Sequence, residues 1–337
     1  MLVVIHHWTT WGHAIGLGNI GVQLFFVLSG FLITNILLSQ RSLMVSGGAT
    51  AWRILARFFV RRAARIWPIM FLTIALVWLA GDRFTPREDI IWHALFSSNI
   101  LFFSKGQFES SLAHFWSLAV EQQFYLFWPF VVLFAPSKWL ELAILLLAIS
   151  APLFRLTLVN QGFADFAQFN VLPFANLDSL GMGALVSLWL RLPREDASQR
   201  CSMMKAAGGM AVIGLVVSLW FVAPANLSQT FFAILFGNLV LASHRGLPGW
   251  AGRLLQSPAL TALGTISYGV YVYHVFAPRA VGMLLRAIDA PALLHGGVLL
   301  FLLSAFATLL AATVSWRLIE QPIMKAAQHT NRSEAPV

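Results

Sequence analysis

Ionisable side chains are rare in the long apolar stretches of this sequence, and those present are of the types that perform acid–base and nucleophilic chemistry. An ionisable residue at the centre of a membrane span costs about 2.5–3.5 kcal/mol, so each one predicts either a function or a buried partner. Those inside predicted spans are His6, His7, Glu121, Asp178 and His274, with Arg317 and Glu320 at the end of the last span.

Polar residues recur along one face of the segment that contains Glu121. His114 precedes Glu121 by seven residues and Tyr125 follows it by four, so a helix places all three on one face, together with Ser117 or Leu118. This face is predicted to point into the protein and, with the other ionisable residues, to line a cavity. The alternative is a polar stripe that hydrogen-bonds to neighbouring helices.

A ladder of arginines precedes a predicted span. Arg53, Arg57, Arg61 and Arg65 recur every four residues, and Arg62 lies beside them. A helix stacks these guanidinium groups on one face, where like charges repel unless an anion lies against them, and phosphate suits guanidinium best. We predict that Arg61, Arg62 and Arg65 bind a phosphate-bearing cosubstrate. Contact with anionic lipid headgroups explains Arg53 and Arg57 equally well.

Several familiar chemistries are excluded by motif. Residues 264–269 (GTISYG) miss the nucleophile elbow of serine hydrolases by one position. There is no HExxH or P-loop pattern, and adjacent histidines point in different directions on a helix, so no metal site is predicted. The single cysteine, Cys201, permits no intramolecular disulfide. Because the basic residues lie between apolar spans, the net charge of +9 indicates membrane orientation and not nucleic-acid binding.

The elements that must position these residues are membrane helices. The chain has 337 residues, of which 58% are hydrophobic and 10% charged, whereas a soluble domain carries roughly 25% charged residues. The sequence predicts an all-α fold, a polytopic transmembrane helix bundle of about ten spans. Nine spans are expected near residues 20–38, 66–80, 115–135, 140–158, 171–190, 206–223, 227–243, 259–278 and 293–316. Residues 1–8 look like the end of a tenth, truncated span, and residues 91–103 like a re-entrant or interfacial piece.

The distribution of basic residues predicts the orientation in the membrane. If the segment after Leu38 is cytosolic, alternation of the spans puts 16 of the 22 Lys and Arg residues on the cytosolic side. This positive-inside bias places both termini in the cytosol. Residues 1–325 are expected to form one membrane-embedded domain, and residues 326–337 a short, disordered cytosolic tail.

Five segments resemble the signatures of one family, the bacterial acyltransferase family 3 of membrane O-acyltransferases. The resemblance covers nearly the whole chain, and the motifs are specific. The segments are residues 21–34 (GVQLFFVLSGFLIT), 59–68 (FVRRAARIWP), 114–125 (HFWSLAVEQQFY), 266–274 (ISYGVYVYH) and 317–322 (RLIEQP). Two positions depart from the family pattern: Gln23 stands where aspartate is common, and Gln321 where arginine or lysine is usual.

The resemblance implies a reaction. Cytosolic acetyl-CoA, or another acyl-CoA, is expected to bind with its phosphates against the arginines at the helix mouth. Residues 2–7 (LVVIHH) resemble the end of the family's first helix, which carries a histidine believed to be catalytic. His7 by gapless reading of that segment, or else His6, then acts as a general base on a sugar hydroxyl or first takes the acyl group itself. Glu121 is expected to orient or polarise that histidine.

The resemblance also implies partners and further site residues. The acceptor is expected to be a glycan or lipid-linked glycan of the cell envelope, and the location the bacterial cytoplasmic membrane, in contact with membrane lipids. Arg317 and Glu320 are expected to form a local ion pair that closes the cytosolic side. Contacts to the substrates are expected from His114, Tyr125, Asp178, Tyr268, His274 and Glu320.

Two other functions are compatible with the sequence. The family's first helix normally begins with an arginine well before the histidine, and this position lies before Met1, so either translation starts upstream or this copy is an inactive relative. A transporter or exporter of a polar or anionic solute also explains intramembrane charges. That function predicts paired inverted halves with broken helices, and the sequence shows no such halves.

Overall fold

Helices make up the regular structure of this protein. The computed structural model describes residues 1–163, 170–220, 225–289 and 297–330, and within these ranges it contains no strand. The longer helices are α3 (Leu17–Val45), α4 (Ala51–Leu79), α7 (Phe115–Phe134), α8 (Ser137–Asn160), α10 (Leu177–Trp189), α11 (Arg194–Trp220), α12 (Ala225–His244) and α17 (Gly297–Ser315).

Shorter helices connect the longer ones. They are α1 (Leu2–Trp8), α2 (Thr10–Ala14), α5 (Ile90–Ala94), α6 (Ser98–Lys105), α13 (Gly249–Leu255), α14 (Pro258–Thr265), α15 (Ser267–Tyr273), α16 (Ala277–Ala287) and α18 (Gln321–Thr330). Two 3₁₀ turns, η1 (Arg87–Asp89) and η2 (Pro173–Asn176), and one π-helical turn, η4 (Trp316–Glu320), complete the described elements.

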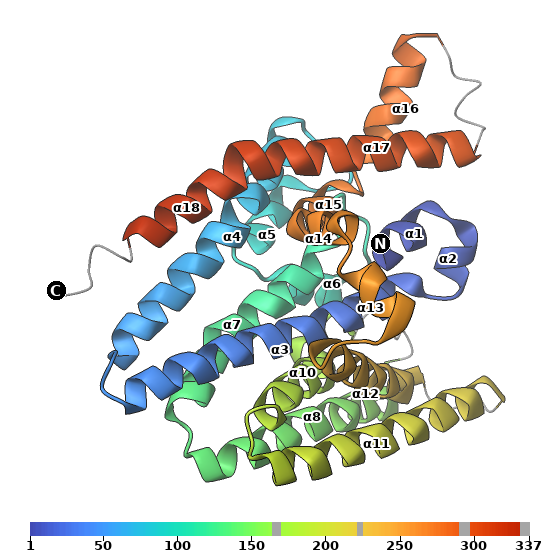
Figure 1. The fold of residues 1–337 in the computed structure, drawn as a ribbon. Coiled ribbons are helices and arrows are strands. Elements are labelled where there is room, and N and C mark those ends of the chain that lie inside the picture. Colours follow the sequence, from blue (N-terminus) through green and yellow to red (C-terminus); the bar gives the residue numbers. More distant parts are fainter. Residues whose placement is uncertain (164–169, 221–224, 290–296, 331–337) are drawn as a thin grey trace.

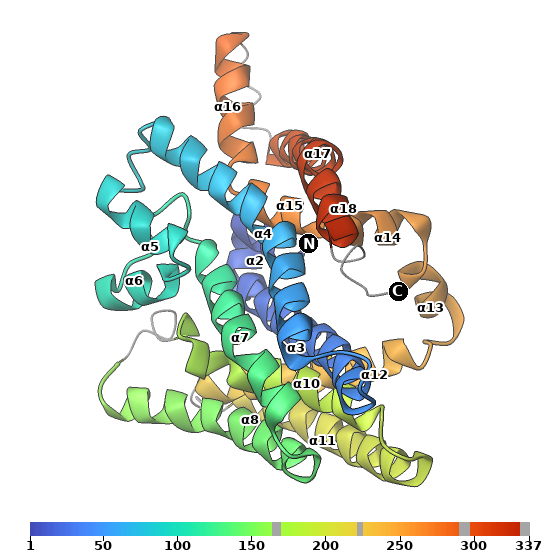
Figure 2. The ribbon, with the colours of Figure 1, turned by 90° about the vertical axis from the view of Figure 1, so that its left-hand side faces the viewer.

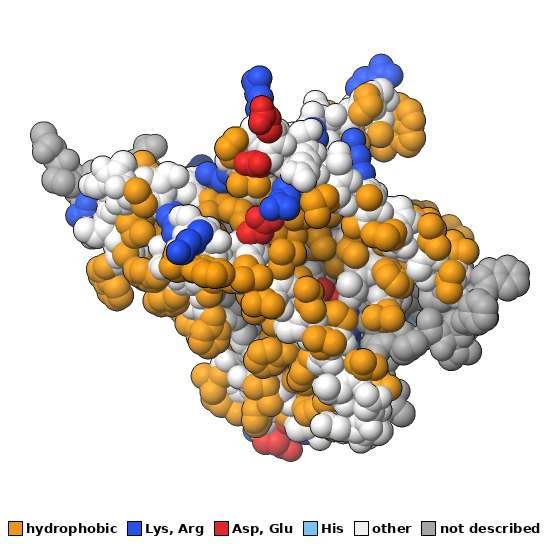
Figure 3. Space-filling model, turned by 90° about the horizontal axis from the view of Figure 1, so that it is seen from below, with side chains coloured by type: hydrophobic (Ala, Val, Ile, Leu, Met, Phe, Trp, Pro, Cys, Tyr) orange, Lys and Arg blue, Asp and Glu red, His pale blue; other side chains and the backbone are white. Residues whose placement is uncertain are grey.

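The bundle has the length and surface of a polytopic membrane protein. In the described ranges, seven helical segments are long and apolar enough to cross a bilayer: α3, α4, α7, α8, α11, α12 and the continuous segment Gly297–Gln328. Large apolar side chains such as Leu76, Phe127, Leu146 and Phe306 are more than half exposed. Figure 3 shows hydrophobic side chains spread over much of one face of the molecule. An apolar surface of this extent is unfavourable in water and favourable in lipid. Together with the seven long apolar helices, it confirms the predicted all-α membrane bundle.

α3 is the central helix of the bundle. It packs against α1, α7, α10 and α12. In Figure 1, α17 and α18 run along the upper edge, α8 and α11 along the lower edge, and α3 and α7 lie between them. Figure 2 shows α5 and α6 at one side of the bundle, beyond α4 and α7. The central position of α3 lets its two faces contact different sets of helices.

Two glycines bring α3 and α10 close together. A Cβ atom on Gly30 would lie 2.0 Å from the carbonyl oxygen of Leu180, and one on Gly183 would lie 1.9 Å from that of Val27. No side chain fits at these distances, so the crossing requires glycine on both helices. Small residues are the usual means by which membrane helices approach closely. The crossing fixes the position of α3, whose other face carries site residues.

Replacing Gly183 with alanine is expected to lower the melting temperature of the detergent-purified protein, because overpacking typically costs about 1–3 kcal/mol. Gly209→Ala in α11 is the matched control, since no heavy atom lies within 4 Å of the added Cβ. Alanine favours the helix at that position, so its melting temperature should stay equal or rise. Equal melting temperatures for Gly183→Ala and the wild type would contradict the close crossing.

The structure refines four expectations about the helices. The arginine ladder belongs to the same helix as the following span, α4. The span expected at 259–278 is broken into α14 and α15, and the piece expected at 91–103 consists of α5 and α6. Residues 326–330 are part of α18 and not of a disordered tail; residues 331–337 lie outside the described ranges.

Candidate active site

A cavity of about 670 Å³ lies among α3, α4, α7, α14 and α15, beside the start of α1. This volume is within the range of small-molecule sites, about 300–1,000 Å³. Most of its wall is apolar. The polar and charged side chains on the wall are those of Ser29, Arg62, Arg65, Glu121, Tyr125, Ser267, Tyr268, Tyr271 and His274. Residues far apart in sequence thus converge on one chamber.

Glu121 is held on the cavity wall by two hydroxyl groups. Its carboxylate accepts short hydrogen bonds from Ser29 of α3 and from Tyr125, one turn later on α7. The Tyr125 hydroxyl also lies 3.3 Å from Ser29 Oγ. Among the described residues, neither His6 nor His7 hydrogen-bonds to this carboxylate. The predicted contact between Glu121 and a first-segment histidine is therefore absent from this arrangement.

Two arginines of the ladder supply positive charge to the cavity. The Arg62 guanidinium lies 5.8 Å from the ring centroid of Tyr125, and its buried Nε has no hydrogen-bond partner among the described residues. The Arg65 guanidinium lies 5.2 Å from the Trp316 ring, and its Nη2 donates to the Thr265 carbonyl at 3.4 Å. Arg61 is exposed and is not part of the wall. Stacked guanidiniums with free N–H groups are well suited to bind phosphate.

His7 reaches the cavity through a second histidine. Its Nδ1 lies 2.8 Å from the Val3 carbonyl oxygen and 3.2 Å from Nε2 of His274, which is fully buried and on the cavity wall. His6 faces elsewhere: its ring stacks on His13 at 4.8 Å, and its Nδ1 lies 3.2 Å from the Gly12 carbonyl oxygen. The structure thus joins His7, and not His6, to the chamber.

His114 lies behind the wall. Its ring centroid is 5.5 Å from that of His274 and 5.5 Å from that of Tyr271. In the part of the chain that is described, neither ring nitrogen of His114 has a hydrogen-bond partner. The hydroxyl of Tyr271 donates to the His114 carbonyl at 2.7 Å. His114 therefore packs against the His7 and His274 pair without lining the cavity.

Tyr268 and Glu320 occupy the side of the cavity near Arg65. The Tyr268 hydroxyl donates to the Ile66 carbonyl at 2.7 Å. Glu320 is buried behind this wall and accepts a hydrogen bond from Ser315 at 3.2 Å. Arg317 is exposed, and the described residues include no ion pair between it and Glu320. The π-helical turn η4 changes the usual helical spacing and separates the two side chains.

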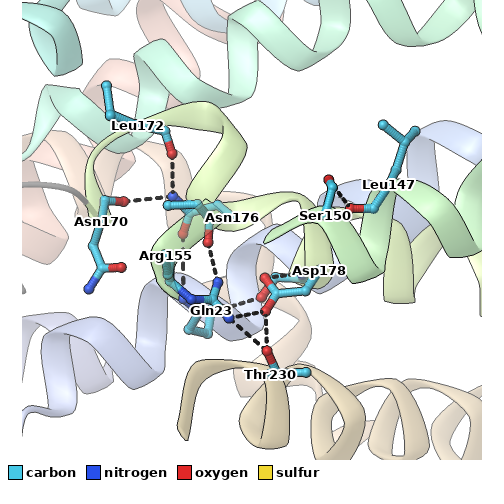
Figure 4. Close-up of polar contacts among 11 residues, drawn as sticks. Gln23, Leu147, Ser150, Arg155, Asn170, Leu172, Asn176, Asp178 and Thr230 are labelled. Atoms are coloured by element: carbon cyan, nitrogen blue, oxygen red, sulfur yellow. Dashed lines mark hydrogen bonds and ion pairs between the residues drawn. The ribbon is translucent and has the colours of Figure 1, made fainter. Parts of the chain in front are cut away.

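Asp178 belongs to a different polar cluster, on the α10 side of α3 (Figure 4). Its carboxylate forms a buried ion pair with Arg155 of α8 at 2.7 Å and accepts a hydrogen bond from Thr230 of α12 at 2.7 Å. Gln23 of α3 extends the cluster, with its Nε2 at 3.4 Å from Asn176 Oδ1. These contacts tie α3, α8, α10 and α12 together, away from the residues that line the cavity.

Replacing Asp178 with asparagine is expected to destabilise the protein by about 3–5 kcal/mol, because it breaks the buried ion pair with Arg155. Thermal unfolding in detergent measures the loss. Glu141→Gln is the control, since it removes the partly exposed pair with Arg200 and should cost about 1 kcal/mol or less. A wild-type melting temperature with impaired catalysis in Asp178→Asn would instead favour a direct contact with substrate.

The comparisons with known proteins decide the family. The family model of the acyltransferase domain matches residues 1–317. This chain belongs to the acyltransferase domain family. The match confirms the resemblance found in the motifs, and the chain is a membrane-embedded member of this family.

Curated relatives of this chain are named as O-acetyltransferases. The peptidoglycan O-acetyltransferase OatA of Listeria monocytogenes is 29% identical over 91% of this chain and 51% of that protein. The putative peptidoglycan O-acetyltransferase YrhL of Bacillus subtilis is 27% identical over 91% and 50%, respectively. The O-acetyltransferase OatA of Staphylococcus aureus is 25% identical over 91% and 53%. The chain spans about half the length of these relatives, and no solved structure matches it significantly.

The sequence analysis missed two residues of this chain, a buried charge and a residue of the cavity wall. Arg155 is a fully buried charge inside a predicted span, and the rule that selected Asp178 selects it as well. Tyr271 lies on the cavity wall, in one of the motifs, and its hydroxyl lies 2.5 Å from Ser117. Its tyrosine identity alone did not distinguish it from the neighbouring Tyr268 and Tyr273.

Proposed function

We propose that this protein transfers an acyl group, acetyl in the first instance, from cytosolic acyl-CoA to a hydroxyl of a cell-envelope glycan. The observation that carries the proposal is the cavity itself. It joins two arginines suited to phosphate, Arg62 and Arg65, to His274 and through it to His7. The names of the curated relatives support O-acetyl transfer and peptidoglycan as the acceptor class.

The donor binds with its phosphates at the arginine end of the cavity. Arg62 and Arg65 are the proposed contacts, and Arg61 lies outside the wall. The apolar wall then accommodates the pantetheine arm, while Tyr125 and Tyr268 contact the substrates from the lining. His114, Asp178 and Glu320 are not part of the lining, so we propose that they act by supporting the residues in front of them.

His7 performs the chemistry by one of two routes. As a general base, its imidazole takes the proton of the acceptor hydroxyl, whose oxygen attacks the thioester carbon; the C–S bond breaks, and the thiolate receives the proton. As a nucleophile, its unprotonated nitrogen first forms the bond to the acyl carbon and the thiolate leaves; the hydroxyl oxygen then displaces the imidazole, and the hydroxyl proton passes to the thiolate. Both routes yield one ester and one free thiol.

The protein is proposed to lie in the bacterial cytoplasmic membrane with both termini in the cytosol. The bias of Lys and Arg toward one set of connecting segments supports this orientation. In this orientation the arginine ladder of α4 lies on the cytosolic side, where acyl-CoA is available. The histidine pair then lies deeper along the route to the outer face.

The test is acyl transfer by the purified protein reconstituted in nanodiscs. Isotope-labelled acetyl-CoA and a peptidoglycan fragment are supplied, and mass spectrometry of the glycan is expected to find one labelled acetyl group added. A His7→Ala preparation is the control for chemical acetylation. If the wild type leaves the glycan unmodified but moves it across a proteoliposome membrane, the protein is a transporter and the proposal fails.

A further inference from the structure

His274 on the cavity wall and His7 beside it form a pair whose proton positions are fixed by the backbone. His7 lies on α1, and His274 follows α15 directly. Their ring centroids are 4.9 Å apart, and His7 Nδ1 lies 3.2 Å from His274 Nε2. Each ring also has its Nδ1 close to one backbone carbonyl oxygen: Val3 at 2.8 Å for His7 and Tyr271 at 2.6 Å for His274.

These contacts determine which nitrogen of each ring carries hydrogen. A carbonyl oxygen only accepts hydrogen bonds, so both Nδ1 atoms are N–H donors. A neutral imidazole has a single N–H, and both Nε2 atoms therefore carry lone pairs. The single Nδ1–H of His7 is then shared between two acceptors, the Val3 carbonyl oxygen at 2.8 Å and His274 Nε2 at 3.2 Å.

From this geometry we propose that His274 is the positioning residue of His7. It accepts the Nδ1–H hydrogen bond of His7, holds the ring in one tautomer, and leaves His7 Nε2 free to react. No hydrogen bond from the described residues reaches that nitrogen. The inference rests on the proposed function, in which His7 is the base or nucleophile.

The arrangement serves both chemical routes. When His7 Nε2 binds a proton or an acyl carbon, the ring becomes positively charged and its Nδ1–H becomes a stronger donor. His274 Nε2 is already in place to accept the strengthened hydrogen bond, as the third member of a catalytic triad does. His274 thus has the role that the sequence analysis assigned to Glu121, whose carboxylate is instead occupied by Ser29 and Tyr125.

The surroundings of His274 suit a fixed acceptor. The side chain is fully buried, so water does not compete for Nε2. Trp8, next to His7, donates its indole N–H to the His274 carbonyl at 3.0 Å, which ties α1 to the segment after α15. Contacts within the protein therefore hold both histidines in place without either substrate bound.

The first test is ¹⁵N NMR of histidine-labelled protein without substrates, with assignments from the His7→Ala and His274→Phe variants. We expect protonated Nδ1 and unprotonated Nε2 on both rings, and a scalar coupling between His7 Nδ1 and His274 Nε2 across the hydrogen bond. A proton on His7 Nε2, or no coupling between the rings, would overturn the proposal. Because no acyl transfer is measured, this result is independent of the proposed function.

The second test compares two substitutions in the transfer assay. In His274→Gln the amide oxygen occupies the position of Nε2 and still accepts a hydrogen bond, whereas His274→Phe keeps only the ring volume. We expect His274→Phe to lower kcat about 10²-fold or more with little change in KM, and His274→Gln to retain activity within about tenfold of the wild type. Equal losses in the two variants, or a raised KM with unchanged kcat, would indicate a structural or substrate-binding residue and contradict positioning.

Discussion

His7→Ala is expected to reduce acyl transfer by about 10²–10⁴-fold if His7 is a general base, and to abolish it if His7 carries the acyl group. Among the first-segment histidines, His7 is the one joined to the cavity, through the hydrogen bond to His274. Its loss removes an imidazole whose Nε2 has no hydrogen-bond partner among the described residues. The rate is measured by transfer of a labelled acetyl group from acetyl-CoA to a glycan acceptor.

His6→Ala is the matched control. Its ring packs against Gly18 and stacks on His13, away from the cavity. We expect the His6→Ala rate to stay within about tenfold of the wild type, since only a packing contact is lost. If His6→Ala were inactive and His7→Ala active, His6 and not His7 would be the reacting histidine. Trapping an acyl group on the protein in the absence of acceptor would separate the nucleophilic route from the base route.

The double substitution Arg62→Gln with Arg65→Gln is expected to raise KM for acetyl-CoA by about 10²–10⁴-fold. Each charge-assisted hydrogen bond to phosphate contributes about 1.5–3 kcal/mol, which is about 10–100-fold per arginine. Both side chains line the cavity, and the Arg62 Nε has no hydrogen-bond partner among the described residues. Steady-state kinetics with varied acetyl-CoA measure the change.

Two controls separate phosphate binding from a general defect. Arg61→Gln removes an exposed arginine of the same helix that is not part of the wall, and its KM should change little. Acetyl-pantetheine carries the thioester without the nucleotide phosphates, so the double variant should use it as well as the wild type does. A double variant equally impaired with both thioesters would show that the arginines support the fold and not the donor.

The position of Glu121 illustrates how a correct residue can have a different partner from the one predicted. The sequence places Glu121 and Tyr125 on one face of a helix, and the structure has both on the cavity wall. Residue types and their spacing do not indicate which side chain, distant in sequence, contacts the carboxylate. The packing of α3 against α7 brings Ser29 there, whereas α1 brings His7 to His274. Residue type and spacing therefore identified Glu121 as a residue of the cavity but did not identify its hydrogen-bond partners.

The helices themselves were largely predictable from the sequence. Apolar runs long enough for a bilayer indicate spans because backbone groups in lipid must hydrogen-bond within their own segment. α3, α7, α8 and α12 lie close to the predicted ranges. The breaks were not predictable: α14 and α15 are separate helices within one apolar run, and the π-helical turn η4 interrupts the last helix. These features depend on contacts with neighbouring helices.

By itself, the sequence determined the membrane environment, the helical fold and the family, because hydropathy, charge distribution and short motifs are local properties of the chain. It also supplied the set of polar residues that a bilayer would otherwise exclude. Only the tertiary structure decided which of them meet. His7 pairs with His274, and Asp178 with Arg155, across 267 and 23 positions of the chain. Such pairings are set by how helices cross and rotate, and that geometry depends on the whole packed bundle.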